Sequence, residues 1–258
     1  MKTGVSTACL YPMETELSLR ILAEQGIDTV EIFINAPSEL EPEYLNALRG
    51  ILKKYSIKVT ALHPYTSGFE PFLFFTNYRR RFCDGLKIYE DFYKAAVFLD
   101  APIFVLHGDH HRSLLTDEEY FERYGEMFLH AKKHGVILAQ ENVERCRSRS
   151  ACFIQKMYKA LGENVRFVLD IKQALRSDET AFTMLEAMGN AVCYLHLSDS
   201  TDENDCLPPG QGSFDFTELY NRLKPVCSDV CGMIELYRQS YKTPDELYAS
   251  YSFLKAIR

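Results

Sequence analysis

Val136-Ile137-Leu138-Ala139-Gln140-Glu141-Asn142 is a short apolar run that closes on a carboxylate and an amide. Such a run is typical of a buried strand that presents a functional group at its end. Five other apolar runs in the chain also finish on a side chain that can bind a metal or move a proton. The six end residues are His63, His107, Glu141, Asp170, His196 and Glu235. Each of the six stands at the C-terminal end of its apolar run, and this common position predicts one shared site.

The whole chain alternates such runs with segments of helical spacing. Strands are expected at residues 3–8, 29–34, 57–63, 102–107, 136–141, 165–170, 192–196 and 231–235, and helices at 13–25, 41–55, 78–99, 117–134, 150–161, 177–188, 214–224 and 244–256. Alternating strands and helices imply a parallel sheet, and eight such units imply a (β/α)8 TIM barrel. The 258 residues contain no linker or low-complexity tract, so we expect one barrel domain over residues 1–258.

Composition narrows the class of partner. The net charge is −7, which disfavours nucleic acid as a partner of the whole molecule. No apolar run reaches the roughly 18 residues of a membrane span, and the N-terminus lacks the features of a signal peptide, so we expect a cytoplasmic protein. The eight cysteines show no zinc-knuckle or redox spacing and are expected to be mostly structural, reduced thiols. The sequence leaves open whether the protein forms a homo-oligomer.

The strand ends are the places to look for chemistry, because barrels of this kind carry their active sites at the C-terminal rim. Three carboxylates and three imidazoles crowded there would repel one another or titrate unless a cation lay among them. A divalent metal ion favours deprotonated carboxylates and neutral imidazole. Mixed nitrogen and oxygen ligands suit manganese, cobalt, zinc or iron better than calcium, and magnesium stays open.

Longer motifs surround these residues. They are Glu141-Asn142, Val168-Leu169-Asp170, the His-Leu-Ser-Asp of residues 196–199, the Pro-Pro-Gly-Gln-Gly-Ser-Phe-Asp-Phe of residues 208–216, and Ile234-Glu235. With these marks nearly the whole chain resembles the xylose isomerase-like barrels. That superfamily includes isomerases and epimerases of sugars and sugar phosphates, and also the endonuclease IV group.

The resemblance to the epimerases implies one metal ion held by Glu141, Asp170, His196 and Glu235. It also implies that Glu141 and Glu235 are the acid and base that remove a proton next to a carbonyl and return it. We therefore expect a metal-dependent isomerase or epimerase of a sugar or sugar phosphate. A non-catalytic sugar-binding barrel would keep the same ligands and remains an alternative.

The endonuclease-like members imply a different use of the same rim. Their second metal site matches His63, His107 and Glu141. Their third site needs two further histidines, but this chain has Gln173 at one position and Leu207 of Asp205-Cys206-Leu207 at the other. A phosphodiester hydrolase is therefore the second choice, and His63 and His107 are either ligands of a second metal or donors to substrate hydroxyls.

Several other residues are candidates for substrate binding. Gln173 stands where many epimerases have a histidine that touches the substrate. Arg145 and Arg238 follow strand ends and either clamp an anion or lie in solvated loops. Gly210 and Gly212 either offer backbone N–H groups to a phosphate or only shape a turn.

Three further features lie outside this set. Glu31, inside a strand, either reaches the pocket or pairs with a lysine or arginine. The aromatic loop Pro64–Asn77 is expected to form a lid or pocket wall. His130 and His134, four residues apart on a helix, have a spacing that can bind zinc, but solvent exposure is expected there.

Overall fold

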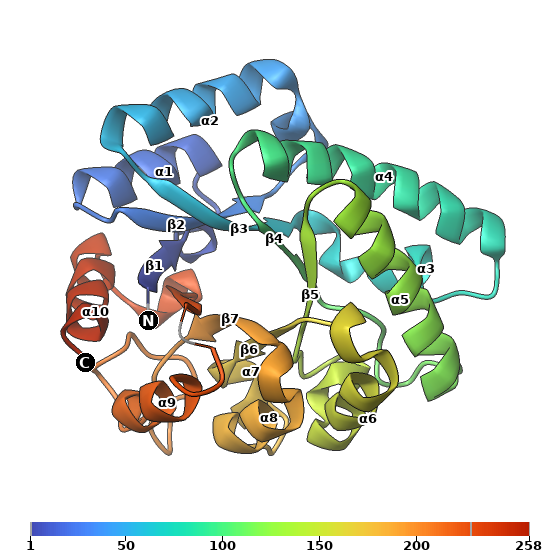
Figure 1. The fold of residues 1–258 in the computed structure, drawn as a ribbon. Coiled ribbons are helices and arrows are strands. Elements are labelled where there is room, and N and C mark those ends of the chain that lie inside the picture. Colours follow the sequence, from blue (N-terminus) through green and yellow to red (C-terminus); the bar gives the residue numbers. More distant parts are fainter. Residues whose placement is uncertain (1, 228, 258) are drawn as a thin grey trace.

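A closed barrel of eight parallel strands forms the centre of the molecule (Figure 1). The computed structural model describes residues 2–227 and 229–257. The strands are β1 (Lys2–Ser6), β2 (Thr29–Ile34), β3 (Lys58–Pro64), β4 (Ile103–Leu106), β5 (Ile137–Glu141), β6 (Phe167–Asp170), β7 (Val192–Leu197) and β8 (Cys231–Ile234). Each strand pairs in parallel with the next, and β8 pairs with β1. The predicted fold class is confirmed.

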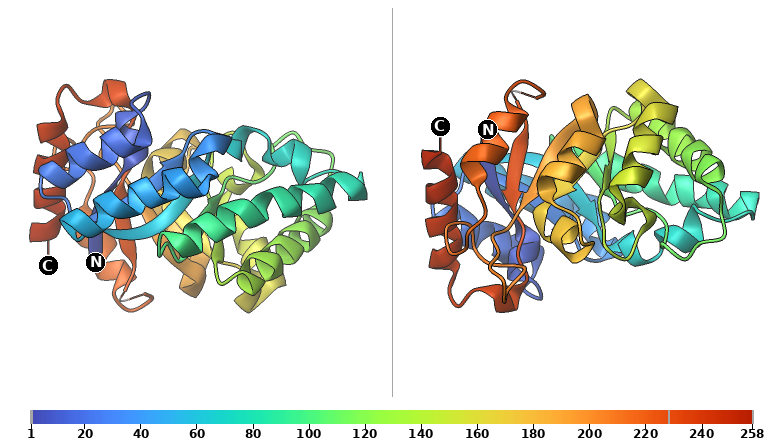
Figure 2. Two further views of the ribbon diagram at one scale, coloured as in Figure 1. Left: turned by 90° about the horizontal axis from the view of Figure 1, so that it is seen from above. Right: turned by 90° about the horizontal axis from the view of Figure 1, so that it is seen from below.

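Helices surround the strands, as Figures 1 and 2 show. The longer ones are α1 (Thr15–Glu24), α2 (Pro42–Tyr55), α4 (Arg79–Phe98), α5 (Asp117–Lys133), α6 (Ala151–Leu161), α8 (Ala181–Met188), α9 (Phe216–Leu223) and α10 (Pro244–Ala256). These agree with the predicted helices to within a few residues. In the described ranges no helix has both the length and the apolar character that a membrane crossing needs. All eight cysteines are unpaired thiols.

Two segments depart from the sequence prediction. A short helix, α7 (Ile171–Arg176), begins directly after β6, and α8 starts only at Ala181 instead of Ser177. The Asp170 side chain caps α7 by accepting a hydrogen bond from Gln173 N (2.8 Å). Asp178, with φ of 59°, separates α7 from α8. The aromatic loop contains a second short helix, α3 (Glu70–Leu73).

The barrel interior explains which side chains reach the mouth. A compact layer inside the barrel consists of Ala61, Ile103, Val105, Ala139, Val168, Tyr194 and Met233. Successive residues of a strand point to opposite faces, so Glu141 shares the inner face of β5 with Ala139. Leu138 points instead to the core between strands and helices. Alternation along β5 therefore aims the Glu141 carboxylate into the barrel at its C-terminal end.

Candidate metal centre at the barrel mouth

The structure brings all six strand-end residues together. Two groups have possible ligand atoms that all lie within 4.8 Å of one another. One consists of Glu141, Asp170, His196 and Glu235, and we call it the quartet; the other consists of His63, His107 and Glu141. Glu141 belongs to both groups, so its carboxylate is the centre of the rim.

His196 organises the quartet. Its Nδ1 lies 2.9 Å from Glu141 Oε1, 3.5 Å from Glu235 Oε2 and 3.8 Å from Asp170 Oδ2. One ring nitrogen thus faces three carboxylates at once. Burial acts to lower the pKa of His196, but the carboxylates, Glu235 foremost, raise it well above its usual value.

Glu31 holds the other side of the same ring. Its Oε2 lies 3.1 Å from His196 Nε2, and both side chains are fully buried. A carboxylate at Nε2 keeps the N–H there and leaves the Nδ1 lone pair for a metal ion, which is the usual arrangement behind a histidine ligand. Of the two roles left open for Glu31, contact with the pocket or pairing with a lysine or arginine, the structure shows a pairing, but the partner is a histidine.

Asp170 is fixed from two sides. Its Oδ1 caps α7, and its main chain exchanges two hydrogen bonds with the Asn142 side chain (Asp170 N to Oδ1, 2.8 Å; Nδ2 to Asp170 O, 2.9 Å). Asn142 therefore ties the end of β5 to the end of β6. This gives a structural reason for the amide that follows Glu141.

The quartet fits a divalent metal ion. Glu141 Oε2 and Asp170 Oδ2 are buried, and neither receives an aligned hydrogen bond, although His107 Nε2 lies 2.8 Å from the first and Lys172 Nζ lies 3.1 Å from the second. Buried carboxylate oxygens are rarely left without a partner, because desolvation is costly. Burial raises the pKa of Asp170 to about 7. A cation at this position would satisfy both oxygens and keep the carboxylates ionised.

Lys172 is a buried charged residue of this centre that the sequence analysis missed. Its side chain is 3% exposed, and its Nζ lies 3.0 Å from Glu235 Oε2 and 3.1 Å from Asp170 Oδ2. Burial acts to raise the pKa of Glu235, but His196 and Lys172 lower it below its usual value. The available signal was a lysine two positions after the strand-end aspartate, which places it in the first turn of α7.

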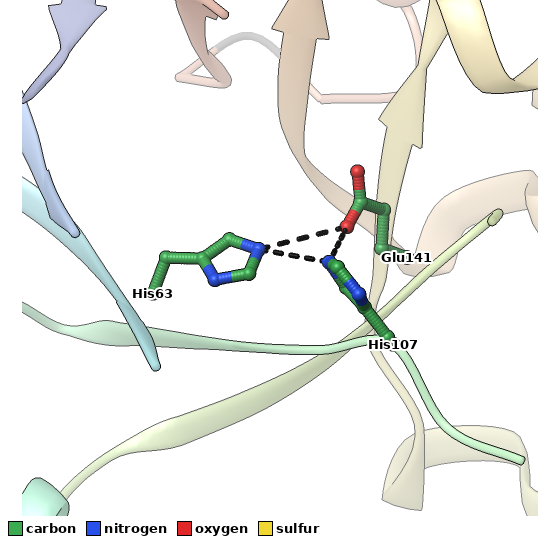
Figure 3. A group of neighbouring side chains, drawn as sticks. All are labelled: His63, His107 and Glu141. Atoms are coloured by element: carbon green, nitrogen blue, oxygen red, sulfur yellow. Dashed lines mark hydrogen bonds and ion pairs between the residues drawn. The ribbon is translucent and has the colours of Figure 1, made fainter. Parts of the chain in front are cut away.

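The two remaining histidines lie beside one carboxylate oxygen of Glu141, as Figure 3 shows. His63 Nε2 and His107 Nε2 are 2.9 Å apart, and they lie 3.8 Å and 2.8 Å from Glu141 Oε2. Arg145 donates to His107 Nδ1 across 2.8 Å. Two ring nitrogens this close can share one proton or bind one metal ion, so both roles predicted for His63 and His107 stay open.

A cavity of about 410 Å³ lies over these groups. His63, His107, Glu141 and Glu235 line it together with the predicted binding residues Arg145 and Gln173. Its aromatic lining consists of Tyr11, Phe33, Tyr65 and Tyr237. Tyr65 and Ser67 are the contribution of the aromatic loop, which therefore forms part of the pocket wall.

Three predicted binding residues form hydrogen bonds within the protein instead of facing the cavity. The Arg238 guanidinium donates to the carbonyls of Tyr241 (3.0 Å) and Lys242 (3.3 Å). The N–H groups of Gly210 and Gly212 both donate to Asp199 Oδ2 at 2.9 Å. A side chain at Gly212 would collide with Asp199, and Gly210 has φ of +93°. Of the two roles left open for Gly210 and Gly212, these contacts favour the turn, because both N–H groups already donate to Asp199.

Comparison with known proteins identifies the class. Residues 19–257 match the family described as xylose isomerase-like TIM barrel, so the chain belongs to that family. Protein ML2432 of Mycobacterium leprae (strain TN), described as uncharacterized, is 23% identical over 237 residues, which cover 83% of this chain and 80% of that protein.

Solved structures share the fold over the full length. The D-psicose 3-epimerase of Clostridium cellulolyticum H10, solved with D-tagatose, has a TM-score of 0.81 at 16% identity and covers 100% of this chain and 99% of its own. The IOLI protein, solved with a zinc atom, has a TM-score of 0.78 at 21% identity, with coverage of 99% and 96%. Identities this low show the fold alone, so the chemistry must be argued from the site.

Proposed function

We propose that this protein is a divalent-metal-dependent isomerase or epimerase that acts on a sugar or sugar phosphate. The observation that carries the proposal is the quartet below the cavity, where His196 Nδ1 faces three carboxylates while Glu31 holds Nε2. The sugar epimerases with the same fold support this choice. So does the zinc atom of the IOLI structure.

The reaction needs a proton to leave the carbon next to a carbonyl and return. A divalent ion held by the quartet would polarise the carbonyl and hydroxyl oxygens of the sugar and stabilise an enediolate. Glu235 and Glu141 both line the cavity and have oxygens near the same point. We assign proton removal and return to this pair. Lys172 is a positioning residue, because its ammonium holds Glu235 Oε2 at 3.0 Å.

The cavity wall suits a small polyhydroxy substrate. The rings of Tyr11 and Tyr237 are partly exposed at the mouth and offer apolar faces, while His63, His107 and Gln173 offer polar groups. Arg145 is the lining residue that we assign to a phosphate or carboxylate, if the substrate carries one. Because Arg238, Gly210 and Gly212 are committed elsewhere, a phosphate would have fewer partners than the sequence suggested.

A metal-dependent phosphodiester hydrolase is the second candidate. The cluster of His63, His107 and Glu141 favours it, since the endonuclease-like members use such a cluster. Against it, Gln173 Oε1 accepts from Glu144 N (3.0 Å) and the Asp205 carboxylate binds Arg176. Within the described ranges, no third group of possible ligands forms at the mouth.

Isotope exchange tests the proposal. The metal-loaded protein is incubated in deuterated water with a panel of ketoses and their phosphates. We expect label at the carbon next to the carbonyl of at least one sugar, and little label with Glu235→Gln. Cleavage of abasic DNA without exchange would favour the hydrolase, and sugar binding without exchange would favour the non-catalytic barrel. Either result would overturn the isomerase.

A further inference from the structure

A third group of possible metal ligands lies away from the mouth, on the outer wall of the barrel. Helices α4 and α5 pack beside each other there (Figure 1). Glu90 of α4 meets His130 and His134 of α5, and their possible ligand atoms all lie within 4.8 Å of one another. The two histidines share a helix face, because residues four apart are neighbours on a helix. The expectation of solvent exposure is wrong, since all three side chains are partly buried.

The spacing of these atoms approaches that of a zinc site. Zinc bonds of about 2.0–2.1 Å place two ligand atoms of one tetrahedral ion about 3.3 Å apart. His130 Nε2 lies 3.4 Å from Glu90 Oε1, so this pair already has that spacing. The rings of His130 and His134 have centroids 5.0 Å apart. The remaining ligand atoms lie within 4.8 Å, so a side-chain movement of no more than about 1.5 Å would bring the third ligand atom to the distance that zinc requires.

His130 points a buried ring nitrogen into this group. Its Nε2 faces Glu90 Oε1 at 3.4 Å without forming an aligned hydrogen bond, although the ring is 21% exposed overall. Burial and the neighbouring His134 lower the pKa of His130, so the ring is neutral, which is the form that binds metals. The buried ring of Tyr93 closes the inner side, at 6.2 Å and 5.8 Å from the two imidazoles.

We propose that Glu90, His130 and His134 bind one divalent ion of the zinc class, with water in the remaining position. Two imidazoles and one carboxylate form a donor set that suits zinc, cobalt or nickel better than calcium. The bound ion would tie α4 to α5 and act on stability. This site does not depend on the function proposed for the barrel mouth.

Zinc counting separates the site on α4 and α5 from the two groups at the mouth. Protein freed of metal is loaded with Zn²⁺ alone, excess ion is removed, and bound zinc is measured by mass spectrometry. The His130→Gln/His134→Gln variant should hold about one ion fewer per chain than wild type, and Glu90→Gln should hold zinc more weakly. The control is His110→Gln/His111→Gln, which removes two exposed, stacked histidines outside any ligand group and should keep the wild-type count.

The change in Tm on adding Zn²⁺ tests the same site independently of the number of bound zinc ions. In the His63→Gln/Asp170→Asn/His196→Gln background, which removes ligands of both groups at the mouth, Zn²⁺ should still raise the Tm, because an ion that binds the folded state stabilises it. Adding His134→Gln should abolish that rise. An equal zinc count in wild type and the double histidine variant, or a Tm rise that survives His134→Gln, would overturn the proposal.

Discussion

The ammonium of Lys172 lies 3.0 Å from Oε2 of Glu235, although Glu235 is a candidate metal ligand. The same Nζ lies 3.1 Å from Asp170 Oδ2. A resident cation therefore stands beside the point where the carboxylates of the quartet converge. In the protein without metal, this ammonium offsets part of the negative charge of the quartet.

The Lys172→Met variant should reveal this role. Without the ammonium, Glu235 and Asp170 lose their nearest cation, and removal of one partner from a buried ion pair typically costs about 3 kcal/mol or more. The metal-free variant should therefore be less stable than wild type. Mn²⁺ should raise its Tm by more than it raises that of wild type, because the added ion replaces the lost charge. Thermal unfolding in EDTA and in Mn²⁺ measures both effects.

The matched control is Lys94→Met. Lys94 pairs with Asp91 at 2.9 Å on the exposed face of α4, away from the cavity. Its loss should leave the metal response unchanged. Equal Mn²⁺-induced Tm shifts in Lys172→Met and wild type would exclude charge compensation by Lys172.

Glu31 should control metal affinity without being a ligand. Replacing it by Gln keeps the shape but removes the carboxylate that fixes the proton on His196 Nε2. Such partners behind a ligand typically contribute about 10–100-fold to metal affinity. We expect Glu31→Gln to bind Mn²⁺ more weakly by about that factor, as measured by calorimetric titration. Glu39→Gln, which alters another buried carboxylate, should keep wild-type affinity; a loss of the same size there would show that the effect is not specific to His196.

Glu70 should make stability depend on pH. It is fully buried in α3, accepts hydrogen bonds from Gly108 N (2.6 Å) and the Tyr89 hydroxyl (3.0 Å), and thereby anchors the aromatic loop. Burial raises the pKa of Glu70 from 4.5 to about 7. Since the folded state holds this proton more tightly than the unfolded state, the contribution is full below pH 4.5 and is lost as the pH rises through 7.

The Glu70→Gln variant has no proton to lose at this position. Between pH 5 and 8, the unfolding free energy of wild type should therefore fall relative to that of Glu70→Gln, by up to about 3 kcal/mol. Urea unfolding at several pH values measures the difference. Glu43→Gln controls for the loss of an exposed carboxylate. A wild-type curve parallel to that of Glu70→Gln would contradict the assignment.

The strand ends could be found from the sequence because their signals are local. An apolar run closing on Glu141 or Asp170 fixes both the strand and the direction in which its end points. Lys172 was missed because its partner Glu235 lies 63 residues away, and only the closed barrel brings them together. Helix α7 was missed because six residues are too few to show helical periodicity.

The sequence could not decide between a phosphate site and a turn at Gly210 and Gly212 for a related reason. The glycines at 210 and 212 do point N–H groups at an anion, but that anion is the carboxylate of Asp199 in the same loop. A glycine pattern predicts that backbone N–H groups point toward an acceptor, but it does not identify the acceptor. His130 and His134 are a different case. Their spacing could be seen in the sequence, but only the packing of α4 against α5 places Glu90 beside them.

Asn142 directly follows β5, and its replacement should lower the stability of the protein. Its fully buried amide makes both hydrogen bonds to the Asp170 main chain. In Asn142→Ala, the Asp170 N–H and C=O lose these partners, and a buried unsatisfied polar group costs about 1–3 kcal/mol. We expect the unfolding free energy to fall by about 2 kcal/mol and Mn²⁺ affinity to fall with it, since Asp170 is no longer tied to β5. Asn46→Ala, which removes an exposed amide bonded to Pro42 O, is the control. Full Mn²⁺ affinity in a destabilised Asn142→Ala would show that Asn142 supports the fold but does not place Asp170.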